Sequence, residues 1–298
     1  MRKSYIIGHP LCVALIAGVL GLGTALADKG GTPNANANGD ANGNASDDSE
    51  GNNSCVGLPG YSALKAALVA ATETETSGLN NQMWGTIVDR DGVVCAVAFT
   101  GVNRGAQWPG SRVISAQKAN TANAFSLDSS SSSDGSGQAN GLAFSTANLY
   151  SAVQPGGSLF GLQLSNPVDT SVAYKGPSIH YGTGNDPMVG RKIGGVNVFG
   201  GGLGLYATGQ KLIGGVGVSG DTSCADHNIA WRVRNNLGLD HLSGVGGVNL
   251  GDLTRPDNII FDITPNINGG TGVSLGGFGH PHCTLTDPAP TVLPAVQP

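Results

Sequence analysis

The spacing of apolar and polar positions predicts helices in four segments of the chain. The first begins near Ser62, which stands where a helix cap is expected, and its apolar positions are Leu64, Ala67, Leu68 and Ala71. A second helix is expected from Ser111, and the positions spaced along it are Ile114, Lys118, Thr121 and Phe125. A short helix from Thr146 should stop at Gln154-Pro155-Gly156-Gly157, and the last should cover about 223–238.

Apolar runs without helical spacing predict an antiparallel sheet. Residues 83–88 and 93–99 flank the turn Asp89-Arg90-Asp91-Gly92, whose glycine suits a β-hairpin. Three further strands are expected at 195–199, 203–206 and 212–218. Helices that bracket antiparallel hairpins indicate an α+β fold, in which a central antiparallel sheet is flanked by helices within a single domain. They do not indicate a parallel nucleotide-binding fold.

Composition divides the chain around this predicted domain, which covers residues 55–242. Residues 28–54 consist almost wholly of small and polar residues, so they cannot bury enough surface to order themselves and are expected to form a flexible leader. The Ser-rich segment 126–141 is expected to be a surface insertion. Residues 243–298 form a Gly- and Pro-rich extension, part of which should pack on the domain through Ile259, Ile260, Phe261 and Ile263.

The N-terminus has the layout of a cleavable secretory signal, predicted over residues 1–27. Arg2 and Lys3 precede an apolar run at 11–22, and Ala25-Leu26-Ala27 supplies a small-residue cleavage site. The run is shorter than the roughly 20 residues that a bilayer core requires, and no later segment is apolar enough to span. The mature protein is therefore expected in the periplasm or secreted from the cell.

Signal cleavage would remove Cys12 and leave four cysteines in a compartment where thiols oxidise, which predicts two disulfides. Four cysteines allow three pairings, and the sequence alone does not choose among them. The expected pairs are Cys55–Cys95 and Cys224–Cys283. Each would tie a terminal segment to a nearby element. A metal site is disfavoured, because no two of these cysteines stand at zinc-ligand spacing.

The charge of the chain argues against partners that require a basic surface. The formal net charge is -5 and only 12% of the residues are charged. No basic face is therefore available to follow phosphates or anionic lipid, and nucleic acid is not an expected partner.

A glycine-rich motif follows the last predicted strand. Residues 215–220 match G-x-G-x-x-G, but the parallel strand and acidic residue that complete a dinucleotide site do not follow. A nucleophile elbow around Ser219 is also disfavoured, since Asp221 stands where the closing glycine is required. Two interpretations remain. Either the N–H groups near Ser219, Gly220 and Thr222 bind a carboxylate-bearing ligand, or the glycines serve only close sheet packing.

The helix expected at 223–238 carries a further candidate site. His227, Trp231 and Arg234 fall on one stripe at positions i, i+4 and i+7. Their side chains would offer a metal ligand, a stacking surface and a carboxylate partner, which are groups that hold haem in proteins. The alternative is an ordinary half-exposed amphipathic face. The segment His280-Pro281-His282-Cys283 is a weaker metal candidate, because its cysteine is expected in a disulfide.

Four motifs occur in a fixed order between about residues 56 and 240. They are Ile-Val-Asp-Arg-Asp-Gly at 87–92, Ser-Ala-Gln-Lys-Ala-Asn-Thr-Ala at 115–122, Gln-Pro-Gly-Gly at 154–157, and Ile-Gly-Gly-Val-Gly-Val-Ser-Gly at 213–220 before a helix with Asp226. Together they resemble the haem-degrading, or GlcG/HbpS-like, family of small haem-binding proteins. The resemblance implies a central antiparallel sheet flanked by helices, assembly into dimers or larger oligomers, and haem binding or degradation in some members. The insertion, the Cys224 and His227 segment and the extension depart from compact members.

The leading hypothesis is an exported haem-binding protein in which an apolar slot between sheet and helices holds the porphyrin or a similar flat, carboxylate-bearing ligand. His227 or a nearby group would ligate the iron, with Trp231 beside it. Arg234 or Lys118 would meet a propionate, and the helix start at 219–222 would donate N–H groups.

Two other classes of function remain open. The first is an enzyme acting on haem or on a small carboxylate, with Lys118 and Asp226 as acid/base candidates. The second is an oligomeric interaction or sensor-accessory module that presents its loops and extension to another exported protein. The family resemblance also predicts a homo-oligomer.

Overall fold

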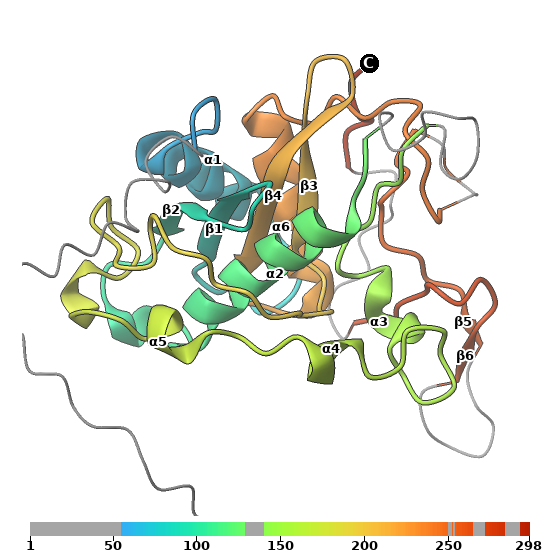
Figure 1. Ribbon diagram of the computed structural model, residues 1–298, viewed down its shortest axis with the longest axis horizontal. Helices are drawn as coiled ribbons and strands as arrows, with labels where there is room; N and C mark the ends of the chain where they lie inside the picture. Colours follow the sequence, from blue (N-terminus) through green and yellow to red (C-terminus); the bar gives the residue numbers. More distant parts are fainter. Residues whose placement is uncertain (1–54, 129–139, 250–251, 253, 265–271, 284–292) are drawn as a thin grey trace, which may run out of the picture. The chain divides into compact units, whose positions relative to one another are not determined.

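A four-stranded antiparallel sheet forms the framework of the fold, in the order β2-β1-β4-β3 (Figure 1). The computed structural model describes residues 55–128, 140–249, 252, 254–264, 272–283 and 293–298. The strands are β1 (Trp84–Asp89), β2 (Val94–Phe99), β3 (Gly202–Ala207) and β4 (Lys211–Ser219). This sheet confirms the predicted α+β fold with a central antiparallel sheet. The predicted signal, the leader and most of the Ser-rich insertion lie outside the described residues.

The β1–β2 hairpin follows from its turn sequence. A side-chain oxygen of Asp89 accepts the backbone N–H groups of Asp91 at 2.9 Å and of Val93 at 2.8 Å. Gly92 adopts a φ of +78°, which favours glycine. On the central strand, Ile87 then stands opposite a residue of β2 on one side and a residue of β4 on the other.

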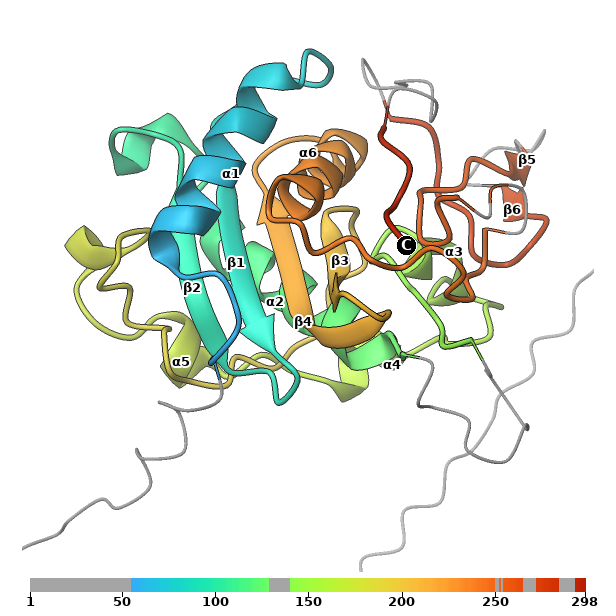
Figure 2. The same cartoon turned by 90° about the horizontal axis from the view of Figure 1, so that it is seen from above.

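Two helices cover one face of the sheet, α1 (Tyr61–Thr74) and α6 (Ser223–Asn236) (Figure 2). The buried residues of α1 are the four predicted from the spacing, Leu64, Ala67, Leu68 and Ala71. The helix follows Gly60 and has no side-chain cap, so Ser62 lies inside the first turn instead of capping it. The cap of α6 is Thr222.

Helix α2 (Ser111–Phe125) packs on the opposite face and comes unusually close to β4 (Figure 2). A Cβ atom on Gly217 would lie 1.9 Å from the carbonyl oxygen of Ser115, and one on Gly215 would lie 2.4 Å from that of Ala119. No side chain fits at either distance. These glycines of the G-x-G-x-x-G motif are therefore required by helix–sheet packing, which was one of the two interpretations of the motif.

The outer side of α2 is covered by a long segment with little regular structure. Its helices are α3 (Leu149–Ala152), α4 (Leu162–Ser165) and α5 (Thr170–Ala173), together with the 3₁₀ turn Ser178–His180. The strand predicted at 195–199 does not form. Gly194 and Gly195 have φ values of +63° and +80°, and neighbouring residues make only isolated bridges. The helix expected from Thr146 begins at Leu149.

The C-terminal extension packs on the domain, in part through the residues expected to do so. Ile259 is buried, and Leu293 and Val296 enter the apolar core between α1, α6 and the sheet. Two short strands, β5 (Ile263–Thr264) and β6 (Val273–Ser274), pair with each other.

Both expected disulfides are present. Cys55 is bonded to Cys95, which ties the segment before α1 to β2, and Cys224 is bonded to Cys283, which ties α6 to the extension. Within the part of the chain that the structure describes, no helix has both the length and the apolar composition to cross a bilayer.

Candidate functional site

A buried ion pair joins α2 to α6. The Nζ atom of Lys118 lies 2.7 Å from a carboxylate oxygen of Asp226 and donates to the carbonyl of Val218 at 3.0 Å. Burial raises the pKa of Asp226 to about 6, although the lysine opposes this rise, and burial lowers the pKa of Lys118. Both side chains are almost fully buried. The two acid/base candidates therefore satisfy each other and are shielded from solvent.

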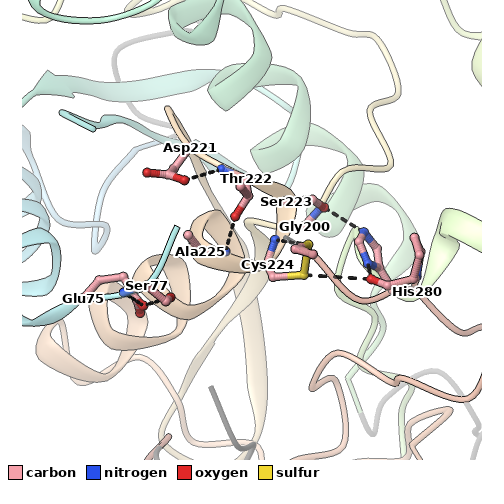
Figure 3. Close-up of a disulfide and its surroundings, with 11 residues drawn as sticks. Glu75, Ser77, Gly200, Asp221, Thr222, Ser223, Cys224, Ala225 and His280 are labelled. Atoms are coloured by element: carbon pink, nitrogen blue, oxygen red, sulfur yellow. Dashed lines mark hydrogen bonds between the residues drawn. A yellow bond between two sulfur atoms is a disulfide. The ribbon is translucent and has the colours of Figure 1, made fainter. Parts of the chain in front are cut away.

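The start of α6 uses the chain's own oxygen atoms as acceptors (Figure 3). The hydroxyl of Thr222 accepts the N–H of Ala225 at 3.3 Å, and Asp221 accepts the N–H of Thr222 at 2.6 Å. The second carboxylate oxygen of Asp226 accepts the N–H of Asp221 at 2.8 Å. Of the backbone donors at 219–222 that were predicted to meet a ligand carboxylate, those of Asp221 and Thr222 are therefore already engaged.

Ser219 and Gly220 are also buried in the framework. Ser219 ends β4 opposite Trp84 of β1. The carbonyl of Gly220 accepts hydrogen bonds from the side-chain amides of Gln107 at 2.7 Å and Asn81 at 3.0 Å. These contacts fasten the end of β4 to neighbouring loops.

The stripe predicted on α6 is covered by the C-terminal extension. The indole N–H of Trp231 donates to the carbonyl of Pro294 at 3.0 Å. The guanidinium of Arg234 forms a bidentate ion pair with the carboxylate of Asp257, at 2.6 and 3.0 Å. It also donates to the carbonyl of Gly204 at 3.2 Å. Its central carbon also lies 4.6 Å from the Trp231 ring centre. The arginine therefore already has a carboxylate partner and a stacking partner.

His227 is fully buried beside this pair. Its Nε2 atom lies 3.0 Å from the side-chain oxygen of Asn258 and 3.2 Å from the backbone N–H donor of Ile259. Burial lowers its pKa to about 4, so the ring is neutral at physiological pH. The slot expected beside the stripe is filled by the chain's own residues. Haem contacts through His227, Trp231 and Arg234 stay a prediction, and they would require the extension to leave α6.

The disulfide Cys224–Cys283 holds the extension at the start of α6 (Figure 3). Beside it, the hydroxyl of Ser223 lies 2.8 Å from Nε2 of His280, and the N–H of Cys224 donates to the sulfur of Cys283 at 3.2 Å. Both sulfur atoms are bonded to each other, so they are not available as thiolate ligands. A metal site built on His280 and these cysteines is incompatible with the disulfide.

A third buried ion pair, between Arg112 and Asp186, was not identified in the sequence. Arg112 of α2 contacts the carboxylate of Asp186, with Nε at 2.9 Å, and donates to the carbonyl of Ala173 at 2.7 Å. Its guanidinium carbon lies 3.6 Å from the ring centre of Tyr181. These contacts fix the irregular segment on the outer side of α2. Arginine at this position carries no local signal of burial, because its partner is distant in sequence.

A cavity of about 680 Å³ lies beside the start of β1 and the end of β2, next to the first two turns of α1. The buried part of its lining is Trp84 stacked on Phe99, with ring centres 4.3 Å apart and planes 16° from parallel. Lys65 of α1 and Arg104, in the 3₁₀ turn Arg104–Ala106, also line it. Its volume is within the range of small-molecule sites. Sequence reasoning missed this cavity because four distant segments form it.

Residues 61–234, from the start of α1 into the last turn of α6, match the family model described as haem degrading protein HbpS-like. The chain belongs to the HbpS-like family. The match includes the whole sheet, α1, α2 and both members of the Lys118–Asp226 pair. It confirms the resemblance noted from the sequence motifs.

Several solved structures are similar to this HbpS-like chain. The PduOC–haem complex is 22% identical, with 59% of this chain and 89% of that chain covered and a TM-score of 0.38. Protein ORFY of Klebsiella pneumoniae is 24% identical, with 60% and 90% covered and a TM-score of 0.37. A double mutant of HbpS from Streptomyces reticuli is 16% identical, with 59% and 82% covered and a TM-score of 0.32. No curated protein matched the sequence.

The HbpS-like region ends before the segment that covers its last helix. Asp257, Asn258 and Pro294, which contact the α6 stripe, all lie beyond residue 234. The covering of this stripe is therefore made by sequence outside the family match.

Proposed function

We propose that this chain is an exported HbpS-like protein that binds haem or a similar flat ligand carrying carboxylates. The observation that carries the proposal is the match of residues 61–234 to a family described as haem degrading. A flat apolar ring gains about 25 cal/mol for each Å² of apolar surface removed from water, before the costs of association are subtracted. A cavity lined by aromatic side chains, with cations at its sides, suits such a ligand.

Two disulfides support the export part of the proposal. Disulfides persist in oxidising compartments and are rare in the cytosol. They agree with the signal-like N-terminus. The homo-oligomer that the family resemblance implies stays a prediction.

Haem would supply iron and its redox chemistry, whereas the protein would bury the ring, pair the propionates and exclude water. Lys118 and Arg234 are poor partners for propionates, because each already lies within 2.7 Å of a carboxylate oxygen. Lys65 and Arg104 fit this role better, since neither has a carboxylate partner among the described residues. The proposal therefore does not depend on the α6 stripe.

Titration of the mature protein with hemin tests the proposal. We expect the Soret band to shift and to saturate near one hemin per chain. The control is the same protein unfolded in guanidinium with its disulfides reduced, which keeps the composition and removes the folded site. An absorbance change that grows without saturating, equally in folded and unfolded protein, would refute haem binding.

A further inference from the structure

We propose that the ligand-binding site of this chain is the cavity at the start of α1, here called the aromatic cavity, and that it takes a flat ring with carboxylates on one edge. The inference rests on the proposed function and assigns its site. The residues that define the aromatic cavity are Tyr61, Lys65, Trp84, Phe99, Arg104 and Tyr181.

Exposed apolar side chains line this cavity. Val102 is 94% exposed and Ile179 is 80% exposed, and they come from two different loops that both line the cavity. Aliphatic side chains in full contact with water are unfavourable, and a flat apolar ring between these loops would cover both. Below them, the stacked pair Trp84 and Phe99, which is 4% and 8% exposed, forms a rigid aromatic floor.

The charge of the lining selects an anionic ligand. Lys65 and Arg104 are the cations of the lining, and no Asp or Glu side chain is among the residues that line it. Lys65 donates to the carbonyl of Phe99 and Arg104 to the hydroxyl of Ser178, so both point toward neutral acceptors. Burial also lowers the pKa of Lys65, an effect that an adjacent carboxylate would oppose. Two cations without counter-ions match a ligand with two carboxylates.

One wall of the cavity is fixed before any ligand binds. The carboxylate of Asp186 accepts the N–H of Gly182 at 2.8 Å and pairs with Arg112, which stacks on Tyr181. A Cβ atom on Gly182 would lie 2.8 Å from the Trp84 ring, so this backbone is held directly against the aromatic pair. The indole N–H of Trp84 is buried and has no acceptor among the described residues. A preformed wall reduces the ordering cost of binding.

The test compares binding of hemin and of metal-free protoporphyrin IX to the mature protein and its variants. Lys65→Gln and Arg104→Gln should each weaken binding about five-fold, because each removes one partly exposed ion pair between a side chain of the protein and a carboxylate of the ligand. Lys211→Gln is the matched control, since Lys211 is an exposed lysine at the far end of β4 from Trp84. Protoporphyrin dimethyl ester, which lacks the free carboxylates, should bind wild type as weakly as the free acid binds a variant that combines Lys65→Gln with Arg104→Gln.

A second variant tests the location without touching a hydrogen bond. Val102→Asp places a negative charge at the cavity, and we expect at least a ten-fold loss of affinity with an unchanged melting temperature. Leu164→Asp is its control, because Leu164 is 86% exposed and lies outside the aromatic cavity. If wild type binds and all variants bind equally, the site assignment is overturned and the proposed function stands. If wild type shows no saturable binding of either porphyrin, both are overturned.

Discussion

Replacing Asp257 with alanine should destabilise the folded domain by about 3–5 kcal/mol. The substitution leaves the guanidinium of Arg234 without a counter-ion at a position where both side chains are 0% exposed. Removing one partner of a fully buried pair costs this much because the remaining charge is kept from water. For a domain of this size, each kcal/mol lowers the melting temperature by roughly 2–4 °C, so a fall of about 6–20 °C is expected.

Thermal and urea unfolding followed by far-UV circular dichroism would measure the effect. The control is Asp252→Ala, which removes a carboxylate from the same extension whose pair with Arg255 is partly exposed, and it should cost at most about 1 kcal/mol. Adding Arg234→Met to Asp257→Leu should recover much of the loss, since a buried pair replaced by apolar residues is often neutral. If Asp257→Ala stays within 1 kcal/mol of wild type, the extension does not seal α6 as described.

Three further predictions concern stability. Gly217→Ala should cost about 3 kcal/mol or more, because the added methyl group would lie 1.9 Å from a backbone oxygen of α2; a chain that unfolds at the wild-type urea midpoint would contradict this. As pH drops from 6.5 to 4, His227 should cost up to about 3 kcal/mol of stability, since the unfolded chain protonates it in that interval and the folded chain does not; His280, whose pKa burial also lowers to about 4, should add to this loss, and the raised pKa of Asp226 should offset part of it. His227→Gln should show a shallower dependence, and an unchanged slope would exclude this histidine as the cause. Cys224→Ser with Cys283→Ser should cost about 4 kcal/mol through the 59-residue loop that it opens, and unfolding of wild type with and without reductant would provide the comparison.

The helices and strands with strong periodicity were predictable because their faces depend on neighbours in the sequence. The spacing of Leu64, Ala67, Leu68 and Ala71 is itself the geometry of a buried helix face. The hairpin at Asp89 to Gly92 follows from a carboxylate that accepts nearby N–H groups and a glycine with positive φ. The strand predicted at 195–199 failed for the complementary reason. An apolar run becomes a strand only when another strand is available to pair with it, and here the sheet is completed by β2 and β3.

The glycine motif illustrates how one pattern can have two readings. The sequence establishes that Gly215 and Gly217 permit another group to approach the backbone closely. It does not establish which group approaches. The structure supplies the answer, since the carbonyl oxygens of α2 occupy the space that a ligand would need. The stripe on α6 is a similar case. Its spacing predicts that the three side chains share a face, but it does not predict which part of the chain packs against that face.

The sequence by itself determined the family, the α+β framework and the face that His227, Trp231 and Arg234 share, whereas the pairing of the four cysteines was settled by the structure. Only the tertiary structure decided that Asp257, Asn258 and Pro294 cover that face, and that Lys65, Trp84 and Arg104 meet around a cavity. The physical reason is the range of the interactions. Helical and strand periodicity arises from residues a few positions apart, whereas burial and charge pairing arise between segments that the folded backbone brings together.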